Sequence, residues 1–204
     1  MQYGAENVRL TSGAIRRISL AIDCPVDASS PAAEVVKTYP LMSGYARCAA
    51  ARFRCGFSNV IPRDRTGSRV EPEDLLPFIC RPRILHLANP NNPAAVYVTQ
   101  GLLAEVIKAR EEAGAHVIID EACDVPLHFH QTNYAWAESP SDIEIQSLSR
   151  SCPSGGVQIG FTDAGSDWIQ RSSQGFAFSD GNVPAAPNYS ILNNLGNPKL
   201  VRHI

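Results

Sequence analysis

One stretch constrains the fold more than any other: residues 84–120 hold a short apolar run, an amphipathic helical pattern and a second apolar run. Ile84–Ala88 and Val117–Asp120 both have the length and composition of buried strands. Between them, Thr99 is placed to cap a helix that ends before Gly114. A strand, a helix and a strand joined this closely predict a right-handed parallel unit of an α/β sheet.

Other parts of the chain predict more elements of the same kind. A helix is expected from Pro72, because proline at a first helical position with two acids behind it is a start signal. Beyond Thr162 the sequence has little periodicity, and we expect irregular structure there. Further strands are expected at Asn7–Leu10, Glu34–Lys37, Gly56–Pro62, Ile143–Gln146 and Val157–Phe161, and further helices after Thr11–Ala14 and over Tyr45–Phe53.

The composition limits which classes of partner the sequence gives reason to expect. With 44% hydrophobic and 19% charged residues, the chain is ordinary for a soluble domain, and residues 1–204 are expected to form one domain. Eighteen basic against twenty acidic residues give a net charge of −2, so charge offers no reason to expect nucleic acid or a membrane as partner. We find no spanning segment and no signal peptide, and expect a cytoplasmic location.

The cysteines and histidines do not predict a metal site. The six cysteines include no C-x-x-C pair, so free thiols are expected rather than a disulfide framework or a zinc site. His128 and His130 would share one side of a strand, but no third ligand is evident. We therefore favour an exposed loop pair.

Three polar segments follow apolar runs of strand length. They are Asn89–Pro93, Asp120–Ala122, and Ser147–Arg150 with Gly156–Gly160 after it. The carboxyl ends of neighbouring parallel strands meet at one edge of a sheet, where ligands commonly bind. The sequence therefore predicts a pocket for a small polar ligand at this edge.

The order and spacing of these segments resemble the large domain of the class I/II, fold-type I aminotransferases, which bind pyridoxal 5'-phosphate. In that family an NPNNP-like loop, a strand ending in D-E-A-Y, and S-x-S-K followed by G-x-R-x-G surround the cofactor. Here the loop is intact, and the other segments are D-E-A-C, S-L-S-R and G-V-Q-I-G. The resemblance covers approximately residues 7–190 and implies an α/β three-layer sandwich with a mostly parallel sheet.

The resemblance implies roles for residues around the cofactor ring. Asp120 matches the carboxylate that pairs with the pyridine nitrogen, and Asn92 matches the amide that donates to the phenolic oxygen. Cys123 stands where many relatives have a tyrosine that touches the same oxygen. Tyr39 is the best match for the ring stacked on the pyridine, with Tyr45 as the fallback. Structural roles stay open: Asp120 as a helix cap, Asn92 as a turn residue and a tyrosine in the core.

The resemblance also implies a phosphate site. The turn at Ser12, Gly13 and Ala14 matches the helix start that holds the phosphate, where first-turn N–H groups are free to bind an anion. Ser147 and Ser149 match hydroxyls near the phosphate. A capped helix without a ligand is the alternative for the turn.

Two informative positions depart from the family pattern. Arg150 replaces the lysine that bonds covalently to the cofactor, and a guanidinium is never a free amine at neutral pH. Gln158 replaces the arginine that clamps the phosphate, which removes a charge-assisted pair worth about 1.5–3 kcal/mol. Lys37 could approach the pocket edge but is a poor substitute. No catalytic residue is therefore assigned, and ordinary transamination is expected to fail.

The leading interpretation is a catalytically degenerate large domain that keeps weak, non-covalent affinity for pyridoxal phosphate or another phosphorylated small molecule. The N-terminal arm and the C-terminal small domain of the family are expected to be absent. One alternative is a working enzyme, either a transaminase or related amino-acid enzyme or a repurposed pocket that uses Cys123, Cys152 or Glu121. Another is a homodimerising interaction module.

Overall fold

The computed structural model describes a little more than half of the chain. The described residues are 5–14, 18, 21, 32–35, 44–45, 47–48, 50–51, 57–61, 63, 69–79, 84–123, 142–147 and 159–179. His128, His130 and Cys152, which the sequence singled out, lie outside them. None of the helices in these ranges is long and apolar enough to cross a membrane.

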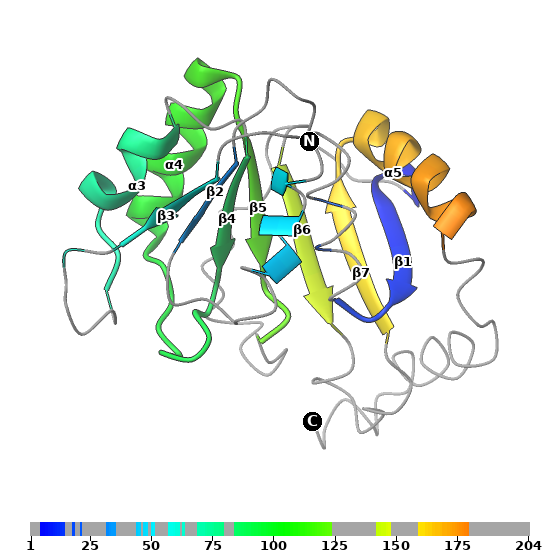
Figure 1. Cartoon of the computed structure of the whole chain (residues 1–204), viewed down its shortest axis with the longest axis horizontal. Coiled ribbons are helices and arrows are strands. Elements are labelled where there is room, and N and C mark those ends of the chain that lie inside the picture. The colour runs from blue at the N-terminus through cyan, green and yellow to red at the C-terminus, as the bar shows by residue number, and fades with distance from the viewer. Residues whose placement is uncertain are drawn as a thin grey trace.

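The strands in the described part of the chain form one seven-stranded sheet at the centre of the fold (Figure 1). In order across the sheet its strands are β1 (Val8–Ser12), β7 (Ile159–Ala164), β6 (Asp142–Ser147), β5 (His116–Asp120), β4 (Ile84–Ala88), β2 (Ala32–Val35) and β3 (Phe57–Val60). Neighbours from β6 to β3 pair in parallel, whereas β7 is antiparallel to both β6 and β1. The sheet is therefore mostly parallel, as expected, and β1 runs in the same direction as the parallel strands.

The strand, helix and strand unit of residues 84–120 is confirmed. Helix α4 (Gln100–Ala113) begins after Thr99, whose hydroxyl oxygen accepts a hydrogen bond from the backbone N–H of Leu102. It ends at Gly114, whose φ of 65° lies in the left-handed region that glycine adopts without strain. Strands β4 and β5 then pair in parallel over their full length.

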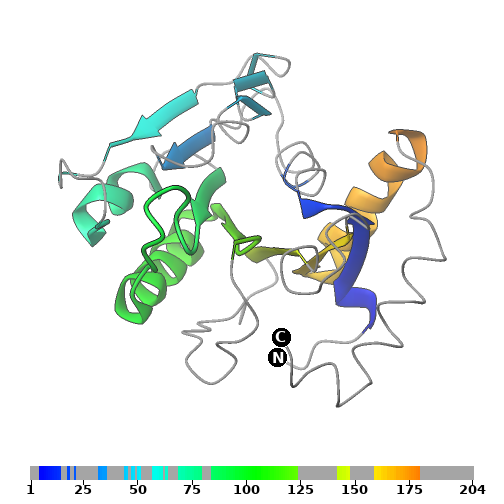
Figure 2. The ribbon, with the colours of Figure 1, turned by 90° about the horizontal axis from the view of Figure 1, so that it is seen from below.

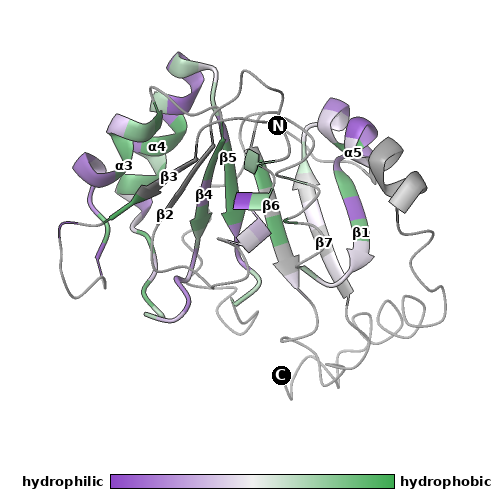
Figure 3. Cartoon of the chain, viewed as in Figure 1, coloured by the Kyte–Doolittle hydropathy of each residue, from purple (hydrophilic) through white to green (hydrophobic). Residues whose placement is uncertain are grey.

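Helices cover both faces of the sheet, which gives three layers. Helices α3 (Pro72–Ile79) and α4 pack on one face, with a core that includes Leu75, Leu85 and Val106. On the other face, α5 (Ser166–Ser179) and the helical residues that begin at Ala14 pack on Ile118, Ile143 and Ile145. Figure 2 shows α4 and α5 on opposite sides of the sheet, and Figure 3 shows the hydrophobic residues concentrated along the central strands.

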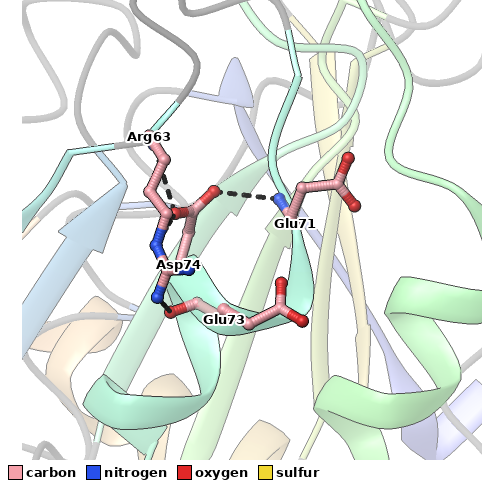
Figure 4. A network of polar contacts seen from close by, with 4 residues as sticks. All are labelled: Arg63, Glu71, Glu73 and Asp74. Carbon is pink, nitrogen blue, oxygen red and sulfur yellow. Dashed lines mark hydrogen bonds and ion pairs between the residues drawn. The ribbon is translucent and has the colours of Figure 1, made fainter.

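The start of α3 is held by a buried carboxylate (Figure 4). The side chain of Asp74 is 1% exposed and accepts hydrogen bonds from the backbone N–H groups of Glu71, at 3.0 Å, and Arg63, at 3.2 Å. The guanidinium of Arg63 lies 3.6 Å from the same carboxylate. The helix expected from Pro72 is therefore confirmed, and Asp74 joins its first turn to the segment after β3.

One expectation about the elements was wrong, and one strand starts earlier than expected. The expectation of irregular structure after residue 162 was wrong, since β7 continues to Ala164 and α5 follows it. Strand β2 begins at Ala32, before the expected start at Glu34, whereas the expected strand ends at Lys37 and Val157 lie outside the described residues. Among the described side chains of α5, Trp168, Ile169 and Ser172 are buried, and the hydroxyl of Ser172 donates to the carbonyl of Ile169. A serine at a buried position weakens the apolar helical pattern in the sequence.

Candidate functional site

The predicted polar segments meet at one edge of the sheet. The parallel strands β4, β5 and β6 end there with Ala88, Asp120 and Ser147. Strand β7 runs the other way, so its first residues begin at this edge, and Gly160 pairs with both Ser147 and Thr11. Ends of strands that are far apart in the sequence are thereby placed side by side (Figure 1).

Asp120 lies at the end of β5 on the face that α5 covers. Side chains alternate along a strand, and Ile118, two residues earlier, belongs to the core on that face. Asp120 is 9% exposed, and its Oδ1 accepts a hydrogen bond of 3.0 Å from the backbone N–H of Ala122. This local bond fixes the carboxylate at the strand end. Within the described residues, the Asp120 carboxylate therefore accepts from a turn N–H and does not cap a helix.

A histidine that the sequence analysis did not assign lies next to this carboxylate. His86 on β4 is 2% exposed, and its Nε2 lies 3.9 Å from Oδ2 of Asp120. Burial lowers the pKa of His86 below 6.5, and the charge of Asp120 opposes that shift by raising it. The net shift is downward, so the imidazole is neutral at pH 7. A histidine inside an apolar strand was the available signal.

The Asn89–Pro93 loop is fastened to the end of β5. The backbone N–H of Asn89 donates to the carbonyl of Asp120 at 2.9 Å, and its side-chain oxygen accepts from the N–H of Val98 at 2.9 Å. The side-chain amide of Asn89 also donates to the buried carboxylate of Glu121, at 3.4 Å. The carboxylate of Glu121 thus helps to hold the loop at the strand end.

Asn92 and Cys123 lie together just after the ends of β4 and β5. The side-chain amide of Asn92 donates to Sγ of Cys123 over 3.7 Å, and both residues are partly exposed. The amide and the thiol come from two strand ends, β4 and β5, and the resemblance assigns them to the same ligand oxygen. The structure therefore brings together two groups that are 31 residues apart in sequence.

The turn after β1 rests directly on β7. A Cβ at Gly160 would lie 2.7 Å from Ala14 N and Gly13 C and 2.8 Å from Gly13 O, so only glycine leaves room for this turn. Gly13 has a φ of 76°, again in the left-handed region. The hydroxyl of Thr11 donates to the carbonyl of Gly13 at 3.0 Å. Ala14, the first helical residue, is thus held at the site edge, where a helix start can bind an anion.

The outcome for the remaining predicted residues is mixed. Strand pairing places Gly160 between Ser147 and Thr11. The other predicted residues, Tyr39, Ser149, Arg150 and Gln158, lie outside the described residues. Lys37, the lysine that the sequence places near the pocket edge, also lies outside the described residues. No group of three or more metal-ligating side chains occurs in the part of the chain that the structure describes.

The described residues fit pyridoxal 5'-phosphate. Asp120 is a nearly buried carboxylate, which favours a cationic partner such as a protonated ring nitrogen. Asn92 supplies an amide donor, and the turn at Gly13 and Ala14 supplies a helix start for a phosphate. Carboxylate, amide and helix start are all at one sheet edge, which matches a ligand with a cationic ring, an oxygen substituent and a phosphate.

Comparison with known proteins supports the fold. No protein-family model matches the sequence, and no curated protein matches it. Among solved structures, an aromatic aminotransferase from Pyrococcus horikoshii superposes with a TM-score of 0.81 at 17% identity, covering 97% of this chain and 53% of that one. The aspartate aminotransferase from Thermus thermophilus gives 0.82 at 16% identity, covering 97% and 51%.

A methionine aminotransferase from Escherichia coli gives a TM-score of 0.81 at 17% identity, covering 96% of this chain and 51% of that one. The chain thus spans about half the length of the structures it matches. Identity at this level carries the fold and not the reaction. The chain therefore has the α/β fold of the large domain of fold-type I, pyridoxal-phosphate-dependent aminotransferases.

Proposed function

We propose that this chain is an aminotransferase-like domain that binds pyridoxal 5'-phosphate without a covalent bond and no longer carries out transamination. The observation that supports this most strongly is the buried carboxylate of Asp120, fixed by the N–H of Ala122 at the edge of the sheet where β4, β5 and β6 end. A carboxylate held in so little solvent favours a cationic ligand group.

Each group has a separate role in this proposal. Asp120 pairs with the ring nitrogen and keeps it protonated, and Asn92 with Cys123 faces the phenolic oxygen. A thiol is a weak donor, so the second contact is weaker than a tyrosine hydroxyl would give. The turn at Gly13 and Ala14 binds the phosphate through backbone N–H groups.

Three further ligand contacts complete the proposal. Tyr39 stacks on the ring, and Ser149 and Gln158 face the phosphate, all three assigned by the resemblance. Ser12 and Ser147 border the same phosphate site at the ends of β1 and β6. The bound cofactor would supply an electron sink for amino-acid chemistry.

The loss of transamination follows from two residues. Arg150 stays protonated and cannot form the covalent bond to the cofactor that the family's lysine forms. Gln158 brings no charge to the phosphate, which lowers affinity by about ten- to a hundredfold through the loss of about 1.5–3 kcal/mol. Binding is therefore expected to be weak and reversible.

The first experiment adds pyridoxal 5'-phosphate to the purified chain and measures binding by absorbance and by the shift of the unfolding transition. We expect reversible binding, and no pyridoxyl adduct in mass spectrometry after borohydride treatment. Asp120→Asn should weaken binding, whereas Asp167→Asn, at an exposed carboxylate on α5, should not. An adduct on any side chain would overturn the proposal and favour a working enzyme.

The second experiment restores the family residues with the double variant Arg150→Lys, Gln158→Arg. If the pocket keeps its geometry, this variant should bind the cofactor more tightly and yield a borohydride-stable adduct on residue 150. No gain in affinity would instead favour a repurposed pocket. Sedimentation of the same samples tests whether the chain forms a homodimer.

A further inference from the structure

The buried side chain of His86 lies on the same face of the sheet as the carboxylate of Asp120, the proposed partner of the ligand. His86 is two residues before Ala88, and Ala88 pairs in register with Asp120. Residues two apart on a strand share a face, so the imidazole is directed to the same layer as the carboxylate. Nε2 of His86 and Oδ2 of Asp120 are 3.9 Å apart. This is too long for a hydrogen bond, so the two groups interact through charge once His86 is protonated.

Among the described residues, the strands on either side of His86 each carry an acid. Glu34 on β2 pairs in register with it, and Asp120 is the acid on the other neighbouring strand. The described core residues on this face are apolar, among them Ile118 and Trp168. A positive charge on His86 therefore interacts strongly with the carboxylate of Asp120, because both side chains are buried from solvent.

We propose that His86 is a positioning residue that makes ligand affinity depend on pH through Asp120. The inference rests on the proposed function, in which Asp120 holds a protonated ring nitrogen. When the imidazole of His86 is neutral, the full negative charge of Asp120 is available to the protonated ring nitrogen of the ligand. An imidazolium at the same distance competes for that carboxylate and repels the cationic ring.

The direction of the effect follows from burial. Burial lowers the pKa of His86 below 6.5, which outweighs the raising effect of Asp120. Around pH 7 and above, His86 is neutral and affinity is at its maximum. As the pH falls below 6.5 and His86 takes up a proton, affinity for a cationic ring falls with it.

The binding test uses pyridoxal 5'-phosphate as probe, with the wild-type chain, His86→Gln and the control His116→Gln. His116 lies at the opposite end of β5 from Asp120. The phosphate of the probe itself titrates near pH 6, so the readout is the difference between variants. On going from about pH 7.5 to about pH 5.5, wild type should lose about fivefold more affinity than His86→Gln, the low end of typical coupling between sites. His116→Gln should follow wild type.

A second measurement needs no ligand and no change at His86. The ring resonances of His86 are followed by NMR through a pH titration, in wild type and in Asp120→Asn. Because Asp120 raises the pKa of His86, its removal should shift the midpoint to lower pH. An unchanged midpoint would overturn the inference.

The outcomes separate the inference from the proposed function. If wild type and His86→Gln bind with the same pH profile, His86 has no positioning role, and the proposed function stands. If wild type binds no pyridoxal 5'-phosphate at any pH, both proposals fail.

Discussion

Replacing Gly160 by alanine is the sharpest test of how the site is built. A methyl group at this position would lie 2.7 Å from Ala14 N and Gly13 C. These are backbone atoms, so no flexible side chain can move aside. Either the turn lifts away from β7 or the strand shifts, and both changes disturb the proposed phosphate site.

The expected cost follows from that contact. Overpacking of a tight site typically destabilises a protein by about 1–3 kcal/mol. For a chain of this size each kcal/mol lowers the Tm by about 2–4 °C, so Gly160→Ala should lower it by about 2–12 °C. Affinity for pyridoxal 5'-phosphate should fall as well, because the helix start at Ala14 is displaced.

The assay is urea and thermal unfolding followed by circular dichroism, with Gly101→Ala as the matched control. A Cβ at Gly101, in the first turn of α4, would meet nothing within 4 Å. Alanine is the better helix former there, so the control should be neutral or more stable by up to about 1 kcal/mol. If Gly160→Ala is as stable as Gly101→Ala and binds the cofactor as well as wild type, the close approach of turn and strand is refuted.

Three other changes test separate parts of the structure. Ala95 has a φ of 55°, so Ala95→Gly should stabilise the chain by up to about 1 kcal/mol in urea unfolding; a loss of stability would contradict the left-handed backbone there. Asp74→Ala removes the acceptor of two backbone N–H groups and should cost about 1–3 kcal/mol, whereas the exposed Glu73→Ala should cost little; equal costs would refute the buried network. The lowered pKa of His86 predicts that the free energy of unfolding falls as the pH drops below 6.5, because the unfolded chain binds the proton first. In urea unfolding at a series of pH values, His86→Gln should make the free energy of unfolding depend less on pH. An unchanged pH dependence would contradict this prediction.

The sequence predicted the elements whose signals are local. Thr99 and Gly114 mark the two ends of α4 by cap chemistry that depends on a few neighbouring residues, and both ends were predicted correctly. Strand β4 was predicted from its apolar composition, and all of its residues are buried. The order of the polar segments was enough to predict the family fold, because each segment follows a strand that can be recognised.

Other features depended on contacts that sequence spacing does not encode. Helix α5 was missed, and a serine, Ser172, holds one of its buried positions. Gly160 was part of a motif, but its role appears only when the turn at Gly13 lies on top of it. This is a long-range effect, because Gly160 and Gly13 are far apart in the sequence.

The candidate site shows the same division. The residue types of Asp120, Asn92 and Cys123 were sufficient to suggest a ligand, since side-chain chemistry is local information. Only the tertiary structure placed the amide against the thiol and His86 against Asp120, because strand register decides which side chains share a face. The sequence by itself determined which groups are available, and the packing of the sheet decided which of them act on one another.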